Sequence, residues 1–172
     1  KVQDVASLVG GGAILGHRVV TLSREIHAGL LATNSPEDTA ELQKLNIPRI
    51  DLVCVDLYPL KEEINKPGST RESVIEKTDI GGPTMLRSAA KGRRIVICHP
   101  SDRMKVINWL KVGKPDADAF ITSLCAKSEA IVADYCLTSA RYHSQGTLDG
   151  QVGWQTMSCL YGENAWQTTA AL

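Results

Sequence analysis

The sequence lacks an excess of charge of either sign, a long apolar run and any cysteine spacing typical of a metal site. Its 19 basic and 19 acidic residues cancel, so no overall field favours nucleic acid or an anionic membrane surface as a partner. No apolar run approaches the length needed to cross a bilayer. With 43% hydrophobic and 22% charged residues among 172, the composition predicts one soluble globular domain with a real core.

The cysteines are odd in number and widely spaced. They are Cys54, Cys98, Cys125, Cys136 and Cys159. Without a C-x-x-C pair or a Cys/His ligand spacing, they predict buried free thiols in a reducing cytoplasm rather than disulfides or zinc, and we expect no metal and no cofactor. The sequence begins with neither a signal peptide nor Met, so we expect a fragment or a processed piece.

The most informative stretch runs from Asp79 to Lys91. A carboxylate precedes a Gly81-Gly82-Pro83 turn, and the turn opens onto good helix formers that end at Gly92. This arrangement predicts a helix whose N-terminus can receive an anion or a polar ring. An ordinary capped surface helix is the alternative.

The stretches on either side alternate between strand and helix patterns. The runs 50–57 and 94–98 are almost continuously apolar, which predicts strands buried on both faces of a parallel sheet. A shorter strand is expected over 17–22. Helical patterns are expected after Ser23, over 36–45, after Ser69 or Thr70, after Ser101 with Met104, Ile107 and Leu110 on its core face, and over 116–142. This order predicts an α/β fold with helices on both faces of the sheet.

Two polar residues come at the end of the first long strand. Ligands of parallel sheets gather beyond the carboxyl ends of the strands, so Asp56 and Tyr58 are candidates for chemistry. The alternative for Tyr58 is an aromatic packed at the rim.

Several segments together resemble a known family. They are Ile50 to Leu60, Lys66-Pro67-Gly68, Asp79 to Lys91 and Tyr161-Gly162-Glu163-Asn164. In order and spacing they are similar to the bifunctional purine-biosynthesis family that joins AICAR transformylase to IMP cyclohydrolase. The resemblance implies the cyclohydrolase domain over 1–150, with an α/β, methylglyoxal-synthase-like three-layer fold, and a tail over 151–172 similar to the start of the transformylase domain. It implies a purine nucleotide, formyl-AICAR or IMP, as ligand, and leaves open whether the chain forms a homodimer.

The resemblance also assigns roles by position. The family's cyclohydrolase closes the purine ring, which requires proton removal from an amide, stabilisation of an oxyanion and proton delivery to a departing oxygen. Tyr58 and Lys91 are implied as the proton-transfer and oxyanion groups, and Asp79 as the residue that orients the lysine or holds the carboxamide. A lysine and a carboxylate at one helix end would shift each other's pKa. Substrate-binding roles are implied for Arg18, Thr21, Asp56, Ile80, Gly81 and Gly82.

The chain departs from the family pattern at informative positions. Val20 stands where a functional lysine is expected, Ser23 replaces a histidine and Asp56 replaces an asparagine. The family's first strand and its phosphate loop are expected before Lys1. These departures keep two alternatives open: a homologue that binds a nucleotide or phosphate as a regulatory module without turnover, and a relative that closes a ring on a different heterocycle.

Overall fold

A small parallel sheet lies at the centre of the fold. The computed structural model describes residues 2–155, and its sheet consists of β1 (Leu52–Cys54) and β2 (Ile95–Ile97). The strands run parallel with Val53 opposite Val96, and both of these side chains are buried. The predicted α/β class with a parallel sheet flanked by helices is confirmed.

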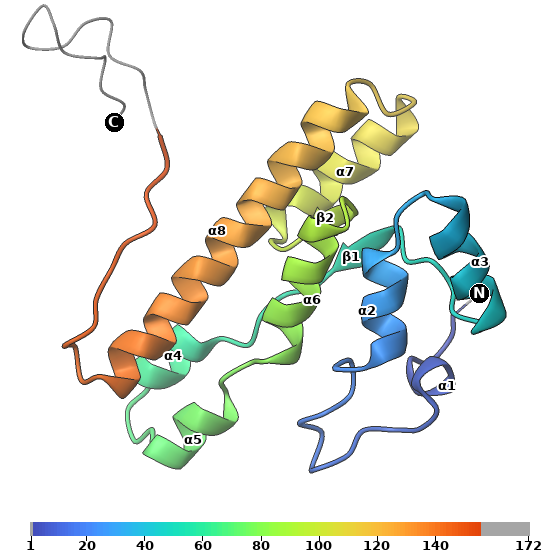
Figure 1. Cartoon of the computed structure of the whole chain (residues 1–172). Helices are drawn as coiled ribbons and strands as arrows, with labels where there is room; N and C mark the ends of the chain where they lie inside the picture. The colour runs from blue at the N-terminus through green and yellow to red at the C-terminus, as the bar shows by residue number, and fades with distance from the viewer. Residues whose placement is uncertain (1, 156–172) are drawn as a thin grey trace, which may run out of the picture.

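Helices make up most of the remaining structure (Figure 1). They are α1 (Ala6–Val9), α2 (Arg24–Leu31), α3 (Pro36–Lys44), α4 (Leu60–Asn65), α5 (Arg71–Glu76), α6 (Gly81–Lys91), α7 (Ser101–Lys111) and α8 (Ala117–His143). Helix α6 packs against α8 on one side and α2 on the other, and α6, α7 and α8 all contact β2. Helix α6 is therefore the centre of the packing.

The helix starts follow from local sequence. The Ser23 hydroxyl accepts a hydrogen bond from the Ile26 N–H, and the Ser35 hydroxyl accepts one from the Asp38 N–H. Thr70 and Ser73 form a reciprocal capping box at the start of α5. Each of these contacts satisfies N–H groups that have no partner inside the helix.

The buried face of α6 explains its residue types. Leu86, Ala89 and Ala90 pack into the core with Leu30 of α2. Gly92 ends the helix so close to α2 that a Cβ there would lie 2.0 Å from the Leu30 carbonyl oxygen. Small residues thus allow α2 and α6 to approach closely.

A buried arginine directly before β2 forms hydrogen bonds with the C-terminus of α2. Arg94 is 3% exposed, and its guanidinium donates to the carbonyls of Leu30 at 2.8 Å and Ala32 at 2.5 Å. Burial lowers the pKa of this guanidinium, and the positive charge of Arg49 lowers it further. The side chain satisfies carbonyls at the C-terminus of α2, where a cation also complements the helix dipole.

The strands differ from expectation in two respects. The segment 17–22 contains no strand: an isolated bridge joins Ile14 to Val19, and positive φ angles at Leu15 and His17 turn the chain. Strand β1 is also shorter than 50–57, and Leu52 and Cys54 are exposed on it. The prediction of a strand buried on both faces was therefore wrong for β1.

The core face of α7 was also predicted wrongly. Met104, Ile107 and Leu110 are exposed, whereas Asp102, Val106 and Trp109 are buried. The buried residues keep helical spacing, but they lie on a different face of α7 from the one predicted. Asp102 can lie on that face because the Lys127 ammonium of α8 contacts its carboxylate at 2.5 Å.

The described cysteines are free, but they are not uniformly buried. Cys98 and Cys125 are buried, while Cys54 and Cys136 are exposed, so the expectation of buried thiols holds for two of these four. Burial raises the pKa of the Cys98 and Cys125 thiols. Cys159 and the segment Tyr161-Gly162-Glu163-Asn164 lie outside the described residues.

Candidate functional site

A cavity of about 690 Å³ opens beyond the end of β1, between the loop before α2, the loop that enters α6 and the last turn of α8. It gathers eight of the nine predicted site residues. They are Arg18, Thr21, Asp56, Tyr58, Asp79, Ile80, Gly81 and Gly82. The ninth, Lys91, does not line it.

The Asp79 carboxylate occupies the N-terminus of α6. One of its oxygens accepts a hydrogen bond from the Gly82 N–H at 2.9 Å, and the other accepts one from the Tyr58 N–H at 3.4 Å. The anion expected at this helix end is therefore the chain's own side chain, stabilised by the helix dipole. A Cβ on Gly82 would lie 2.5 Å from the carboxylate, so glycine leaves room for Asp79.

Tyr135 of α8 holds the loop that carries Asp79. Its hydroxyl accepts a hydrogen bond from the Asp79 N–H at 2.7 Å and donates one to the Lys77 carbonyl at 3.2 Å. Burial raises the pKa of the Tyr135 phenol, and the Asp79 N–H opposes that rise. No local pattern in the sequence points to this residue, because it lies 56 positions from Asp79.

The other predicted binding residues form the cavity wall. The Thr21 hydroxyl lies 2.9 Å from where a Cβ of Gly81 would be. Arg18 pairs with Glu76 at 2.8 Å, and Asp56 pairs with Arg103 of α7. The charges of Arg18 and Asp56 are thus partly neutralised by neighbours on the protein.

Lys91 lies at the opposite end of α6 from Asp79. It is the last residue of the helix and is exposed, and at 1.5 Å per residue the helix places it roughly 15 Å from the Asp79 end. The expectation that Asp79 and Lys91 share one helix end does not hold in this structure.

The cavity also contains residues that the sequence analysis missed. Lys77 lines it, and its Nζ lies 5.9 Å from the centroid of the Tyr58 ring. His143 reaches it from the end of α8. Lys77 is two positions before Asp79, which is a signal that could have been used, whereas His143 comes near only through the tertiary fold.

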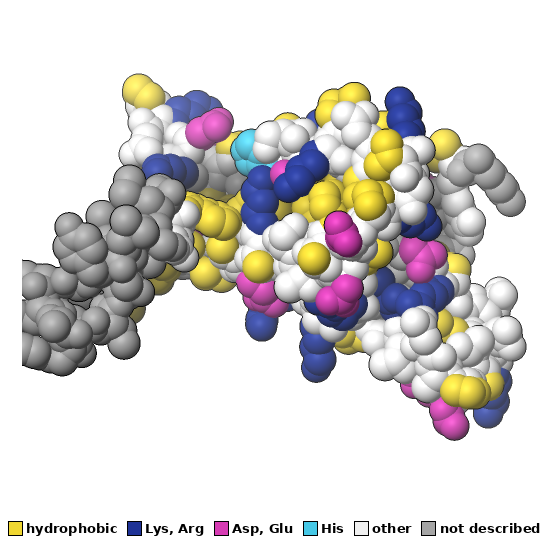
Figure 2. Space-filling model, turned by 90° about the horizontal axis from the view of Figure 1, so that it is seen from above, with side chains coloured by type: hydrophobic (Ala, Val, Ile, Leu, Met, Phe, Trp, Pro, Cys, Tyr) yellow, Lys and Arg dark blue, Asp and Glu magenta, His cyan; other side chains and the backbone are white. Residues whose placement is uncertain are grey.

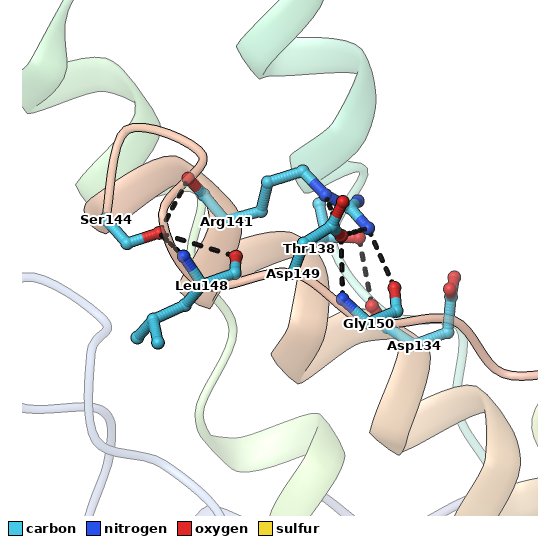
Figure 3. Close-up of polar contacts among 7 residues, drawn as sticks. All are labelled: Asp134, Thr138, Arg141, Ser144, Leu148, Asp149 and Gly150. Atoms are coloured by element: carbon cyan, nitrogen blue, oxygen red, sulfur yellow. Dashed lines mark hydrogen bonds and ion pairs between the residues drawn. The ribbon is translucent and has the colours of Figure 1, made fainter.

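Helix α8 ends at His143. The chain then folds back along the helix, and Figure 3 shows the contacts that hold it there. The Arg141 guanidinium contacts the Asp149 carboxylate and donates to the Gly150 carbonyl at 2.9 Å. The Ser144 hydroxyl accepts a hydrogen bond from the Leu148 N–H at 2.9 Å. These contacts fix the helix end that borders the cavity.

A second cavity, of about 580 Å³, lies between α6 and α8. It shares Thr78, Asp79, Ile80 and His143 with the first, and Tyr135 and Cys136 line it. The first cavity is the candidate site, because Tyr58 and Arg18 line it and do not line the second.

Further observations restrict the kinds of site present. Over residues 2–155, no group of three His, Cys, Asp or Glu side chains is placed to hold a metal ion. No helix in that range is long and apolar enough to span a membrane. On the face shown in Figure 2, basic and acidic side chains are interspersed with exposed hydrophobic ones.

Fold and site together define an α/β domain with a cavity beyond the carboxyl end of a parallel strand, which is where ligands of such sheets gather. No family model matches the sequence. The chain is 42% identical over 168 residues to the bifunctional purine biosynthesis protein PurH of Leuconostoc citreum, covering 92% of this chain and 32% of that protein. It is 38% identical over 176 residues to the PurH of Trichormus variabilis, covering 98% of this chain and 34% of that protein.

A solved structure extends the comparison. The crystal structure of ForH matches with a TM-score of 0.72 and 33% identity, over 86% of this chain and 78% of that one. The chain belongs to the PurH family and corresponds to its methylglyoxal-synthase-like domain. It spans about a third of the length of the PurH proteins that it matches.

Proposed function

We propose that this chain catalyses the cyclohydrolase reaction of purine biosynthesis, in which formyl-AICAR closes to IMP with loss of water. The main support for this proposal is that Tyr58 and Asp79 line one cavity. Arg18, Thr21 and the start of α6 line the same cavity. The names of the PurH relatives support a purine-pathway ligand. The transformylase reaction is no part of this proposal.

The reaction forms one bond and breaks another at the formyl carbon. The carboxamide nitrogen attacks that carbon, and the carbonyl electron pair moves onto the oxygen. The oxygen leaves as water after taking one proton from the carboxamide nitrogen and one from the formamide nitrogen, which then forms the new C=N bond. The site must therefore move protons and stabilise an oxyanion.

Asp79 is suited to hold the carboxamide. A carboxylate has about four lone-pair sites, and the hydrogen bonds from Gly82 and Tyr58 engage one site on each oxygen. The remaining sites can accept an N–H of the carboxamide and orient its nitrogen toward the formyl carbon. Of the two roles that the resemblance implies for Asp79, this geometry favours holding the carboxamide over orienting Lys91.

Tyr58 is suited to proton transfer at the formyl oxygen. Its side chain lines the cavity and is 52% exposed, so its hydroxyl can reach a bound nucleotide. A catalytic role for Lys91 rests on the resemblance alone, and Lys91→Ala tests it separately.

The test is IMP formation from formyl-AICAR by the purified chain, compared with Asp79→Asn and Tyr58→Phe. Loss of a proton-transfer or orienting group lowers kcat about a hundred- to ten-thousand-fold. Asp118→Asn is a matched control, because Asp118 is 93% exposed in its side chain and pairs with Arg93 at 2.5 Å, outside the cavity. Equal rates for Asp79→Asn and the unmodified chain would refute the assigned site.

Val20 favours a second candidate, which is binding of a purine nucleotide without turnover. Val20 lines the same cavity and stands where the family pattern has a lysine. Val20→Lys separates the two: a gain of IMP formation from an inactive starting protein would indicate a lost reaction. A fall in activity from an active one would indicate a cavity adapted to its present ligand.

A further inference from the structure

We infer that Lys77 supplies the cation that contacts the formyl oxygen during ring closure, in place of the lysine that Val20 replaces. This inference rests on the proposed function. Lys77 and Val20 line the same cavity as Tyr58 and Asp79.

The position of the ammonium supports this role. The Lys77 Nζ lies 5.9 Å from the Tyr58 ring centroid, within the range of a cation–π contact. Lys77 and Tyr58 therefore place a positive charge and a phenol next to each other in the cavity. An oxyanion that forms beside Tyr58 would lie within reach of both.

The other charged side chains of the cavity wall described below pair with neighbours other than Lys77, so the Lys77 ammonium can contact a ligand. Lys77 and Arg18 are the lysine and arginine side chains that line the cavity, and Arg18 is paired with Glu76 at 2.8 Å. Asp56 is paired with Arg103. Within residues 2–155, no carboxylate lies within 4.0 Å of the Lys77 ammonium.

The backbone of Lys77 is fixed even though its side chain is exposed. Its carbonyl accepts the hydrogen bond from the Tyr135 hydroxyl at 3.2 Å, and the same hydroxyl accepts the Asp79 N–H at 2.7 Å. Tyr135 thereby holds Lys77 and Asp79 in a constant relation to each other. Such fixed placement lowers the cost of stabilising charge in the transition state.

In the proposed step, the carboxamide nitrogen bonds to the formyl carbon and the carbonyl pair moves to the oxygen. The Lys77 ammonium donates a hydrogen bond to that oxygen as its negative charge develops. The two protons that complete the departing water come from the carboxamide and formamide nitrogens, so Lys77 ends the cycle in its starting protonation state.

The experiment measures kcat and KM for formyl-AICAR with the full 172-residue chain and with Lys77→Ala, Lys77→Arg, Val20→Lys and the Val20→Lys, Lys77→Ala double variant. Lys77→Ala should lower kcat about a hundredfold or more, with a smaller change in KM. Adding ethylamine should restore part of that loss. The double variant should be faster than Lys77→Ala, because the lysine at position 20 replaces the missing cation.

Controls make each result decisive. Lys44→Ala removes an exposed lysine at the end of α3 and should leave kcat unchanged, and circular dichroism checks the fold of every variant. A folded Lys77→Ala protein with unchanged kcat would overturn the role of Lys77 and leave the proposed function standing. Absence of IMP formation by the unmodified chain would overturn the proposed function, and this inference with it.

Discussion

The hydroxyl of Tyr135 accepts a hydrogen bond of 2.7 Å from the backbone N–H of Asp79. This contact joins α8 to the loop that presents a carboxylate at the start of α6. Because the same hydroxyl also donates to the Lys77 carbonyl, one phenol positions two residues of the cavity. Tyr135 is thus a positioning residue that need not touch a ligand.

Tyr135→Phe should lower kcat for IMP formation about tenfold, because a net loss of one or two hydrogen bonds is worth roughly 1–2 kcal/mol. The effect should fall on kcat more than on KM, since Asp79 remains present but less constrained. Tyr142→Phe removes a hydroxyl from the same helix and serves as the control. Equal kcat values for the two variants would show that the Tyr135 contact does not position Asp79.

Alkaline pH should weaken the fold through the same residue. Burial raises the folded-state pKa of Tyr135 above its ordinary value of 10.0, so the unfolded chain releases this proton first as pH rises. The stabilising contribution of the protonated Tyr135 phenol to the free energy of unfolding is fully present below pH 10. It is lost as pH rises through the folded-state pKa of Tyr135.

Urea unfolding at about pH 8.5 and about pH 11 measures this loss. The unmodified chain should lose more stability between the two conditions than Tyr135→Phe, which has no phenol to titrate. Parallel losses in both proteins would contradict the assignment.

Arg94 should matter more for stability than its neighbour Arg93. Arg94→Met leaves the carbonyls at the end of α2 without their buried donors, and we expect a cost of about 3 kcal/mol in the free energy of unfolding. Arg93→Met removes an exposed pair with Asp118 and should cost about 1 kcal/mol or less. Urea unfolding of both variants compares them, and a smaller cost for Arg94→Met than for Arg93→Met would argue against the capping role.

The four described cysteines should separate into two classes in alkylation. Cys54 and Cys136 are exposed, whereas Cys98 and Cys125 are buried with raised thiol pKa values. Iodoacetamide should label the exposed pair first, because the thiolate is the reactive form. Peptide mapping by mass spectrometry follows each site, and early labelling of Cys98 or Cys125 in the native protein would disagree with the fold.

Local signals in the sequence predicted the starts of α2 and α3. Ser23 and Ser35 cap helices because their hydroxyls reach N–H groups within three residues, which requires no knowledge of the rest of the fold. The same holds for the start of α6, where the Asp79 carboxylate accepts a hydrogen bond from the Gly82 N–H three residues later. The start of α6 contributes Gly81 and Gly82 to the cavity wall.

Tertiary contacts explain what the sequence did not show. Asp102 lies on the buried face of α7 because Lys127 reaches it from α8, so an apolar pattern alone selects the wrong face. Tyr135 likewise reaches Asp79 only through the tertiary fold, because the two residues lie 56 positions apart in the sequence. The separation of Lys91 from Asp79 could have been worked out from the helix rise, since both residues flank one continuous helix.

The most direct measurement is the ultraviolet absorbance change on mixing the purified 172-residue protein with formyl-AICAR, with IMP identified by chromatography. The proposed function predicts IMP at a rate proportional to protein concentration, and little or none with Asp79→Asn. A flat trace, with calorimetry still detecting nucleotide binding, would contradict ring closure and indicate a binding module instead.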